Sequence, residues 1–283
     1  MDAQHTLSCH CEECVSTTSQ SYDILPRPLG EGWGEGFTLA EVLITLGIIG
    51  VVAALTIPTL MQKTDDRENI SRLKKFYSVA ENAFKLAEVE NGTVDKWGLN
   101  RSLYSSQYNN PDTSPEAKAA SDAGVNKFWS ILLPYFNNAK IVGNGKGDLA
   151  NYLLDGREND TIGKIVEFSD GSVVRSTFIT ENVSCIEGSR QNDNMCGDFF
   201  LDVNGDKKPN TLGKDIFAFK ILKDGIIPYG TKGSSNRSFE TSCNMTSSNE
   251  ANGFGCTAWV LLNDNMDYLY CNDLDWETKT KCN

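Results

Sequence analysis

Histidine is nearly absent from this chain. The sequence has 283 residues and two histidines, His5 and His10, so no histidine follows position 10. A Ser-His or Cys-His pair needs an imidazole as its base, and many zinc sites need imidazole as a ligand. The residues after His10 therefore form neither kind of site, and we expect no enzymatic activity.

Positive charge is also scarce. Lysine and arginine total 26, against 38 aspartates and glutamates, and the formal net charge is -12. Broad nucleic-acid binding needs clustered lysine and arginine on the surface. The acidic balance argues against such binding, and no specific nucleic-acid partner is indicated.

A third absence is more specific, because no charged residue lies between Val42 and Leu60. This run has 19 residues, and roughly 20 are needed to cross a bilayer core as a helix. It is apolar on every side, which is typical of a membrane span or of the buried centre of an assembly. Gly47 and Gly50 permit close helix approach. Pro58 removes one intrahelical hydrogen bond and predicts a kink or loosening near the end of the run.

Glu41 lies just before the uncharged run, where a bare carboxylate in lipid costs a few kcal/mol. The residues Gly36-Phe37-Thr38-Leu39-x-Glu41 resemble the type III signal of type IV prepilins and type II secretion pseudopilins. The resemblance covers Gly36 to about Leu60. Three further features fall where family members have them: Gly50, the pair Ala53-Ala54, and Pro58.

The resemblance implies three parts of the chain. Residues 1–36 are a leader that a prepilin peptidase removes after Gly36, and the new amino-terminal Phe37 is then methylated. Residues 37–60 are a transmembrane and assembly helix, and residues 61–283 are a periplasmic or extracellular head domain. The leader is long and acidic, whereas leaders of the family are usually short and basic. The leader contains a cluster of possible metal ligands, and the alternative is that its thiols have no binding role. The residues of this cluster are Cys9, His10, Cys11 and Cys14.

The implied function is structural. The chain resembles a subunit of a type IV pilus or type II secretion pseudopilus, in the cytoplasmic (inner) membrane with its head outside. The implied partners are copies of itself, related pilin subunits, the peptidase and methyltransferase, an inner-membrane assembly platform and membrane lipid before assembly. Glu41 would pair with the amino terminus of Phe37 on a neighbouring subunit. The alternative is a monomeric membrane-anchored binding protein, which has no evident need of Glu41. Whether the filament is a pilus or a pseudopilus stays open.

The rest of the chain predicts an α+β head with an antiparallel sheet. Apolar residues at three- and four-residue spacing extend the first helix to about Glu90, before an Asn91-Gly92 stop. These apolar positions are Ile70, Leu73, Phe76, Ala80, Ala83, Phe84 and Ala87. Two further helices are predicted at 115–133 and 257–263. The predicted strands are 164–168, 172–179, 199–203, 216–222 and 226–229. Residues 137–149 and 230–252 are predicted to be a connector and a long surface loop.

No cysteine lies between Cys14 and Cys185. Six then follow, and six cysteines in an exported domain favour disulfides, with fifteen possible pairings. Their spacing favours pairing between neighbours: Cys185 with Cys196, Cys243 with Cys256, and Cys271 with Cys282.

Oxygen-bearing side chains alternate from Asp202 onward, around a glycine. This pattern suits a hard cation such as calcium, and its start resembles an EF-hand loop. Gly213 stands where the closing glutamate would be. The candidate ligands are Asp202, Asn204, Asp206 and Asp215. The alternative is a turn in which Asp202 and Asn204 bond backbone amides.

Overall fold

The computed structural model describes residues 37–99, 115–143, 151–159, 165–179, 185, 195–234 and 237–282. The leader 1–36, with its cysteine and histidine cluster and Gly36, lies outside the described residues. The chain divides into two compact units, one ending at Ala53 and the other beginning at Ala54.

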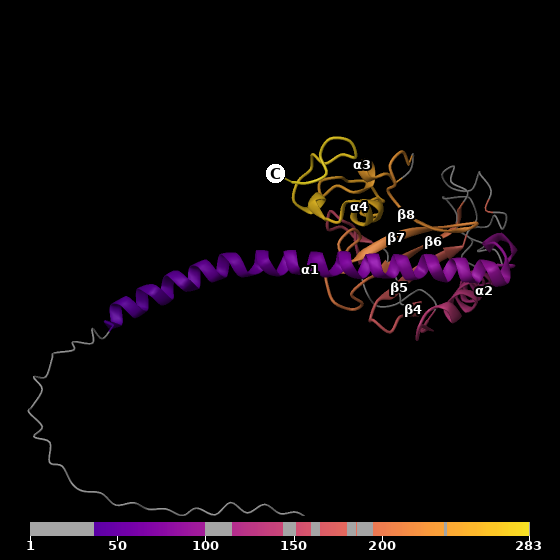
Figure 1. Ribbon diagram of the computed structural model, residues 1–283, viewed down its shortest axis with the longest axis horizontal. Coiled ribbons are helices and arrows are strands. Elements are labelled where there is room, and N and C mark those ends of the chain that lie inside the picture. Colours follow the sequence, from indigo (N-terminus) through magenta and orange to yellow (C-terminus); the bar gives the residue numbers. More distant parts are fainter. Residues whose placement is uncertain are drawn as a thin grey trace, which may run out of the picture. The chain divides into compact units, whose positions relative to one another are not determined.

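The two long helices come first along the chain, and the strands follow them. The helices and short 3-10 turns are α1 Leu39–Asn91, η1 Val94–Lys96, α2 Pro115–Leu132, η2 Leu133–Tyr135, α3 Phe239–Ser242, α4 Cys256–Asn263 and η3 Asp267–Leu269. The strands are β1 Lys140–Ile141, β2 Asn151–Tyr152, β3 Glu158–Asn159, β4 Val166–Glu167, β5 Val173–Ile179, β6 Met195–Asp202, β7 Ile216–Leu222 and β8 Gly225–Pro228. Six strands form one antiparallel sheet in the order β1-β4-β5-β6-β7-β8, and β2 pairs with β3 (Figure 1). The predicted α+β class is confirmed.

Helix α1 has 53 residues and matches its predicted bounds within two residues. It ends where predicted, because Gly92 adopts a φ of 75° and its N–H donates to the Glu88 carbonyl at 2.8 Å. Such a left-handed glycine closes a helix at little steric cost. At Pro58, where the sequence predicts a loosened helix, α1 continues without interruption.

The second half of α1 packs against the sheet. All seven predicted apolar positions are buried, together with Asn69. The Phe76 ring lies 5.3 Å from that of Phe168, 6.2 Å from Phe199 and 6.1 Å from Phe219, measured between centroids. Figure 1 shows the second half of α1 running along the face formed by β5, β6 and β7. The core of the head therefore lies between α1 and this face.

The other face of the sheet holds a second cluster. Its apolar members are Leu153, Met195, Phe200, Leu212, Ile216, Ala218, Tyr229 and Phe254. Polar groups are buried there too, since the Tyr229 hydroxyl donates to Asp198 Oδ2 at 3.0 Å. Alternation along β6 puts Asp202, two residues after Phe200, on the same face. The loop after β6 thus starts from a buried carboxylate.

Several predicted segments differ from the structure. The predicted connector 137–149 contains the short strand β1, and β4 is shorter than the predicted strand 164–168. Strand β6 begins at Met195 rather than at residue 199. All eight of its residues are buried, and pairing with the strands on both sides extends it beyond what local sequence predicts. The predicted loop 230–252 contains the short helix α3, whose start is capped by Ser238 Oγ accepting from the Thr241 N–H at 3.3 Å. Phe239 of α3 stacks on Trp259 with 3.9 Å between centroids, which fixes α3 against α4.

The three disulfides join the neighbours that the spacing favours. They are Cys185–Cys196, Cys243–Cys256 and Cys271–Cys282, with Cα separations of 4.6, 5.0 and 5.9 Å. Each closes a short loop in the half of the chain that has few long elements. Two of them lie in the part after β8: Cys243–Cys256 joins the end of α3 to the start of α4, and Cys271–Cys282 closes a loop in the last residues.

Candidate functional site

The start of α1 is organised by Glu41. Its Oε2 accepts from the Thr38 N–H at 2.9 Å and from Thr38 Oγ1 at 2.8 Å. In return the Glu41 N–H donates to Thr38 Oγ1 at 3.2 Å. This reciprocal arrangement is a capping box, which satisfies backbone donors at the helix start. Glu41 therefore has a structural partner within its own chain. This partner was not predicted, although the T-x-x-E spacing is a local signal for a capping box.

The helix after Glu41 presents apolar side chains on all sides. Every Phe, Leu, Ile and Val from 37 to 60 is between 39% and 85% exposed. Among the described residues, α1 is the one helix that is long and apolar enough to cross a membrane. A Cβ added to Gly47 or Gly50 would meet no atom within 4 Å. An apolar surface of this extent is typical of a segment that contacts lipid or another protein.

The second candidate site is the loop 203–215 between β6 and β7, where the sequence predicts calcium. Asp202 ends β6 and Ile216 begins β7. Gly205 turns the loop with a φ of 70°, and a Cβ at this position would lie 2.6 Å from the Gly171 carbonyl oxygen. Only glycine allows this close approach between the loop and the β4–β5 turn.

Asp202 is fully buried and bonds a fully buried arginine. Arg175, from β5, donates through Nε and Nη2 to Asp202 Oδ2 at 2.9 and 2.7 Å. Its Nη2 also donates to the Gly205 carbonyl at 2.7 Å. Neither the position nor the role of Arg175 could be predicted from spacing, because the two partners are 27 residues apart. The loop is thus anchored to β5 by a buried ion pair.

Asp215 organises the far end of the loop. It is fully buried, and its oxygens accept the N–H groups of Asn210 at 2.9 Å and of Thr211 at 2.5 Å. Asn204 Nδ2 lies 3.4 Å from Asp215 Oδ2. Asp215 therefore holds the loop backbone, and its oxygens are largely occupied by donors.

Burial dominates the electrostatics of these carboxyls. Loss of hydration raises the pKa of Asp202 to about 7, against the lowering effect of Arg175, while the nearby Asp215 raises it further. Loss of hydration also raises the pKa of Asp215, opposed by the Thr211 and Asn210 N–H groups. Burial therefore disfavours the charged form of both carboxyls, and Arg175 offsets this effect at Asp202.

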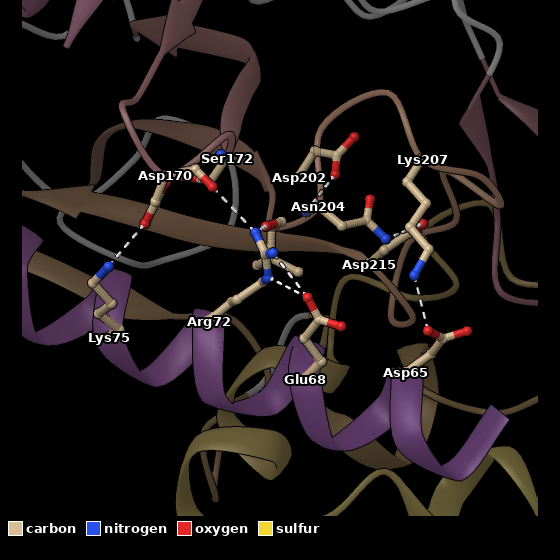
Figure 2. Close-up of polar contacts among 11 residues, drawn as sticks. Asp65, Glu68, Arg72, Lys75, Asp170, Ser172, Asp202, Asn204, Lys207 and Asp215 are labelled. Atoms are coloured by element: carbon tan, nitrogen blue, oxygen red, sulfur yellow. Dashed lines mark hydrogen bonds and ion pairs between the residues drawn. The ribbon is translucent and has the colours of Figure 1, made fainter. Parts of the chain in front are cut away.

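Helix α1 borders this loop with a row of charged side chains (Figure 2). Lys207 of the loop pairs with Asp65 at 2.9 Å. Arg72 donates to the carbonyls of Asp170 at 3.2 Å and Val203 at 3.3 Å. Further along the helix, Lys75 lies 3.5 Å from Asp170 Oδ2. These contacts fix the loop and the β4–β5 turn to the second half of α1.

Of the four predicted calcium ligands, the structure brings Asn204 next to Asp202 and Asp215. Asp202 and Asn204 face the interior of the loop, whereas the Asp206 side chain is 57% exposed and lies 3.3 Å from Arg175. No group of three His, Cys, Asp or Glu side chains gathers as a metal cluster within the described ranges. A further oxygen side chain, Asn210, is 3% exposed inside the loop. Asn210 also bears a side-chain oxygen at an even spacing from Asp202, but it was not among the four predicted ligands.

A long amino-terminal helix followed by a six-stranded antiparallel sheet is consistent with a pilin-like architecture. The chain belongs to the family described as "Family of unknown function (DUF6613)", which matches residues 59–266. The chain is also 28% identical over 95 residues to the type II secretion system core protein G of Aeromonas hydrophila. That match covers 32% of this chain and 62% of the relative. No solved structure matches the chain. The similarity to core protein G supports a pilin-like relationship.

Proposed function

We propose that this protein is a structural subunit of a pilin-like filament, either a type IV pilus or a type II secretion pseudopilus. The observation that carries the proposal is the exposed, uncharged helix behind Gly36 and Phe37, with a single carboxylate at its start. In this proposal residues 1–36 are removed, residues 37–60 span the cytoplasmic membrane, and residues 61–283 form a head outside it. The similarity to a secretion core protein supports the same assignment.

Assembly would proceed from the membrane into a bundle of helices. The side chains exposed from 37 to 60 contact lipid first and neighbouring subunits afterwards. Processing after Gly36 frees the amino group of Phe37, which is the nearest cation for Glu41 of a neighbouring subunit. A buried pair of this kind contributes more to register than to net stability, because desolvation offsets much of the attraction. The partners are other copies, related subunits, the peptidase and an assembly platform in the membrane.

The rival proposal is a monomeric protein that uses the same helix as an anchor. The capping box favours this rival more than the sequence alone did, because Thr38 gives Glu41 a role in a single chain. The two proposals differ in what they require of Glu41. A filament requires its negative charge, whereas an anchor requires a side chain that accepts from the Thr38 N–H.

Glu41→Gln separates these requirements, because glutamine also completes a capping box but carries no charge. In a filament subunit, Glu41→Gln chains insert, lose the leader and accumulate in the membrane, while sheared filaments fall at least about tenfold, which corresponds to about 1.4 kcal/mol. Amino-terminal sequencing of the membrane fraction should begin Phe-Thr-Leu-Ala-Glu for wild type and Phe-Thr-Leu-Ala-Gln for the variant.

The matched control is Glu68→Gln, which makes the same change on an exposed glutamate of α1 beside Arg72. It should leave filament yield unchanged. Normal filaments from Glu41→Gln cells would remove the charge-pairing mechanism. A wild-type chain that keeps its leader and sediments only as a monomer would establish the anchor instead.

A further inference from the structure

The three disulfides of the head differ in how well the rest of the chain covers them. The four cysteines of the first two bridges are at most 4% exposed. Cys271 and Cys282, which form the third bridge, are both partly exposed. Loop-closure entropy does not distinguish the first bridge from the third, because both join cysteines that are 11 residues apart. The difference between these two bridges is therefore one of access.

Access controls the chemistry of a disulfide. Exchange begins when a thiolate attacks one of the two sulfur atoms, so a bridge that the folded chain covers reacts slowly. Structural bridges resist reduction, whereas exposed bridges belong to the labile and regulatory class. By its exposure, the third bridge belongs to the labile class.

A cleft in the surface leads to this bridge. The cleft has a volume of about 200 Å³ and lies between α3 and the residues that follow η3. Cys271 lines it together with Asn272 and Leu274. Cys243 also borders the cleft, but it is 4% exposed and its disulfide partner Cys256 is fully buried. The cleft therefore favours attack on the sulfur of Cys271.

The third bridge holds the last residues against η3. The Cys282 N–H donates to Asp267 Oδ2 at 2.7 Å, and Asn265 Nδ2 donates to the Thr280 carbonyl at 3.0 Å. Without the covalent bond, these hydrogen bonds compete with water, which leaves each of them weak in net terms. The chain end is therefore the part that opening the bridge loosens first.

Two aromatic side chains limit how far the opening spreads. Tyr268 is buried, and its hydroxyl donates to the Gly213 carbonyl at 2.6 Å. The Trp276 ring lies 5.6 Å from that of Phe239 and 5.0 Å from that of Trp259, measured between centroids. The parts that depend on the bridge are thus the residues between and after these anchors, 269–275 and 277–282.

One of these stretches contacts α1. Tyr270, the residue before Cys271, donates from its hydroxyl to Asp66 Oδ2 at 2.5 Å. Asp267, which accepts a hydrogen bond from the chain end, also lies near Asp66. Loss of hydration raises the pKa of Asp66, the hydrogen bond from Tyr270 lowers it, and the negative charge of Asp267 adds to the rise. The bridge is thus one residue away from a contact with the helix.

We propose that Cys271–Cys282 is a site of thiol–disulfide exchange, at which a dithiol partner opens the chain end and weakens the hydrogen bond between Tyr270 and Asp66. A thiolate of the partner attacks the Cys271 sulfur, forms a mixed disulfide and releases Cys282 as a thiolate, which takes up a proton. The second thiol of the partner loses its proton and attacks the mixed disulfide. The partner then leaves as a disulfide, and Cys271 is released as a thiolate that is protonated in turn.

The inference does not depend on the filament proposal, because an anchored monomer would carry the same bridge. The first test reduces the purified full-length chain in detergent with dithiothreitol, a small dithiol, and blocks free thiols with iodoacetamide at successive times. Peptide mapping should find Cys271 and Cys282 alkylated at least about tenfold faster than the other four cysteines of the head.

The matched control for this test repeats the reduction in denaturant. Burial is then lost, and the three bridges should open at similar rates. Equal rates in the folded chain would overturn the proposal. Alkylation of Cys271 and Cys282 without any dithiothreitol would overturn it as well, because no bridge would then be present to exchange.

The second test measures the contact with α1. Tyr270→Phe removes the hydroxyl that bonds Asp66, so it should lower Tm in the oxidised chain. In a chain that also carries Cys271→Ser and Cys282→Ser, the same change should lower Tm by less than about half as much, because the interaction is already weakened. Where the serine variant fails to fold, wild type and Tyr270→Phe chains reduced and alkylated at this bridge replace it.

Tyr135→Phe is the control for the second test. Tyr135 donates to Glu90 Oε2 of α1 at 2.6 Å, a hydrogen bond that involves no residue of the chain end. Its loss should change Tm equally with and without the bridge. An equal effect of Tyr270→Phe in both forms would overturn the link between the bridge and the helix.

Discussion

The two halves of α1 are parts of one continuous helix, yet they present opposite surfaces. Up to residue 60 every large apolar side chain is exposed, whereas from Asn69 to Ala87 the apolar side chains are buried against the head. The difference lies in the arrangement of polar residues. The first half has none that is charged after Glu41, and the second alternates charge with an apolar stripe. An apolar stripe can be buried against the head of the same chain, whereas a helix that is apolar on all sides needs lipid or another chain to cover it.

The largest expected contrast comes from deleting one large apolar side chain in each half. Phe76→Ala removes a ring that contacts Phe168, Phe199 and Phe219, and it should lower the free energy of unfolding by about 3–5 kcal/mol. Ile49→Ala, at a side chain that is 63% exposed, should change head stability by less than about 0.5 kcal/mol. Chemical denaturation in detergent, followed by tryptophan fluorescence, measures both. Equal losses would show that the halves are not distinct.

Local patterns explain which parts of the fold could be predicted. Helix periodicity is written within three or four residues, so the buried positions of α1 and the glycine stop were found, and β7 was predicted with its observed bounds. Strand β6 was predicted too short because Gly197 and Asp198 are unusual in strands. Their strand conformation depends on pairing with β5 and β7.

In the candidate sites too, the residues with a local sequence signal could be predicted and those with distant partners could not. Asp202 and Asn204 were found because alternating oxygens are a local signal, and the Thr38–Glu41 capping box had a local signal that could have been used. Arg175 had none, since its partner lies on another strand. The burial of Asn210 depends on how the loop turns, which no rule of residue spacing predicts.

A second prediction sharpens the comparison by weakening the head alone. Replacing Cys243 and Cys256 by serine releases a bridge between the end of α3 and the start of α4, which spans 13 residues. Loop-closure entropy predicts a loss of about 3 kcal/mol. The measurement is circular dichroism of the full chain in detergent during heating. Head unfolding should move to lower temperature, while the helical signal of the first half of α1 persists above it. Loss of all helix in one step would contradict independent halves.

The smallest expected effect concerns the charged border between α1 and the loop. Lys207 and Asp65 pair at 2.9 Å, but their side chains are 56% and 49% exposed. Water and salt screen such a pair, so Lys207→Met should lower the free energy of unfolding by only about 0.2–1 kcal/mol, and less at high salt.

The matched comparison is Arg175→Met, which leaves the fully buried Asp202 without its cation and should cost about 3–5 kcal/mol. Denaturation of both variants at low and high salt measures the contrast. A loss from Lys207→Met as large as that from Arg175→Met would mean that the helix border, rather than the buried pair, holds the loop in place.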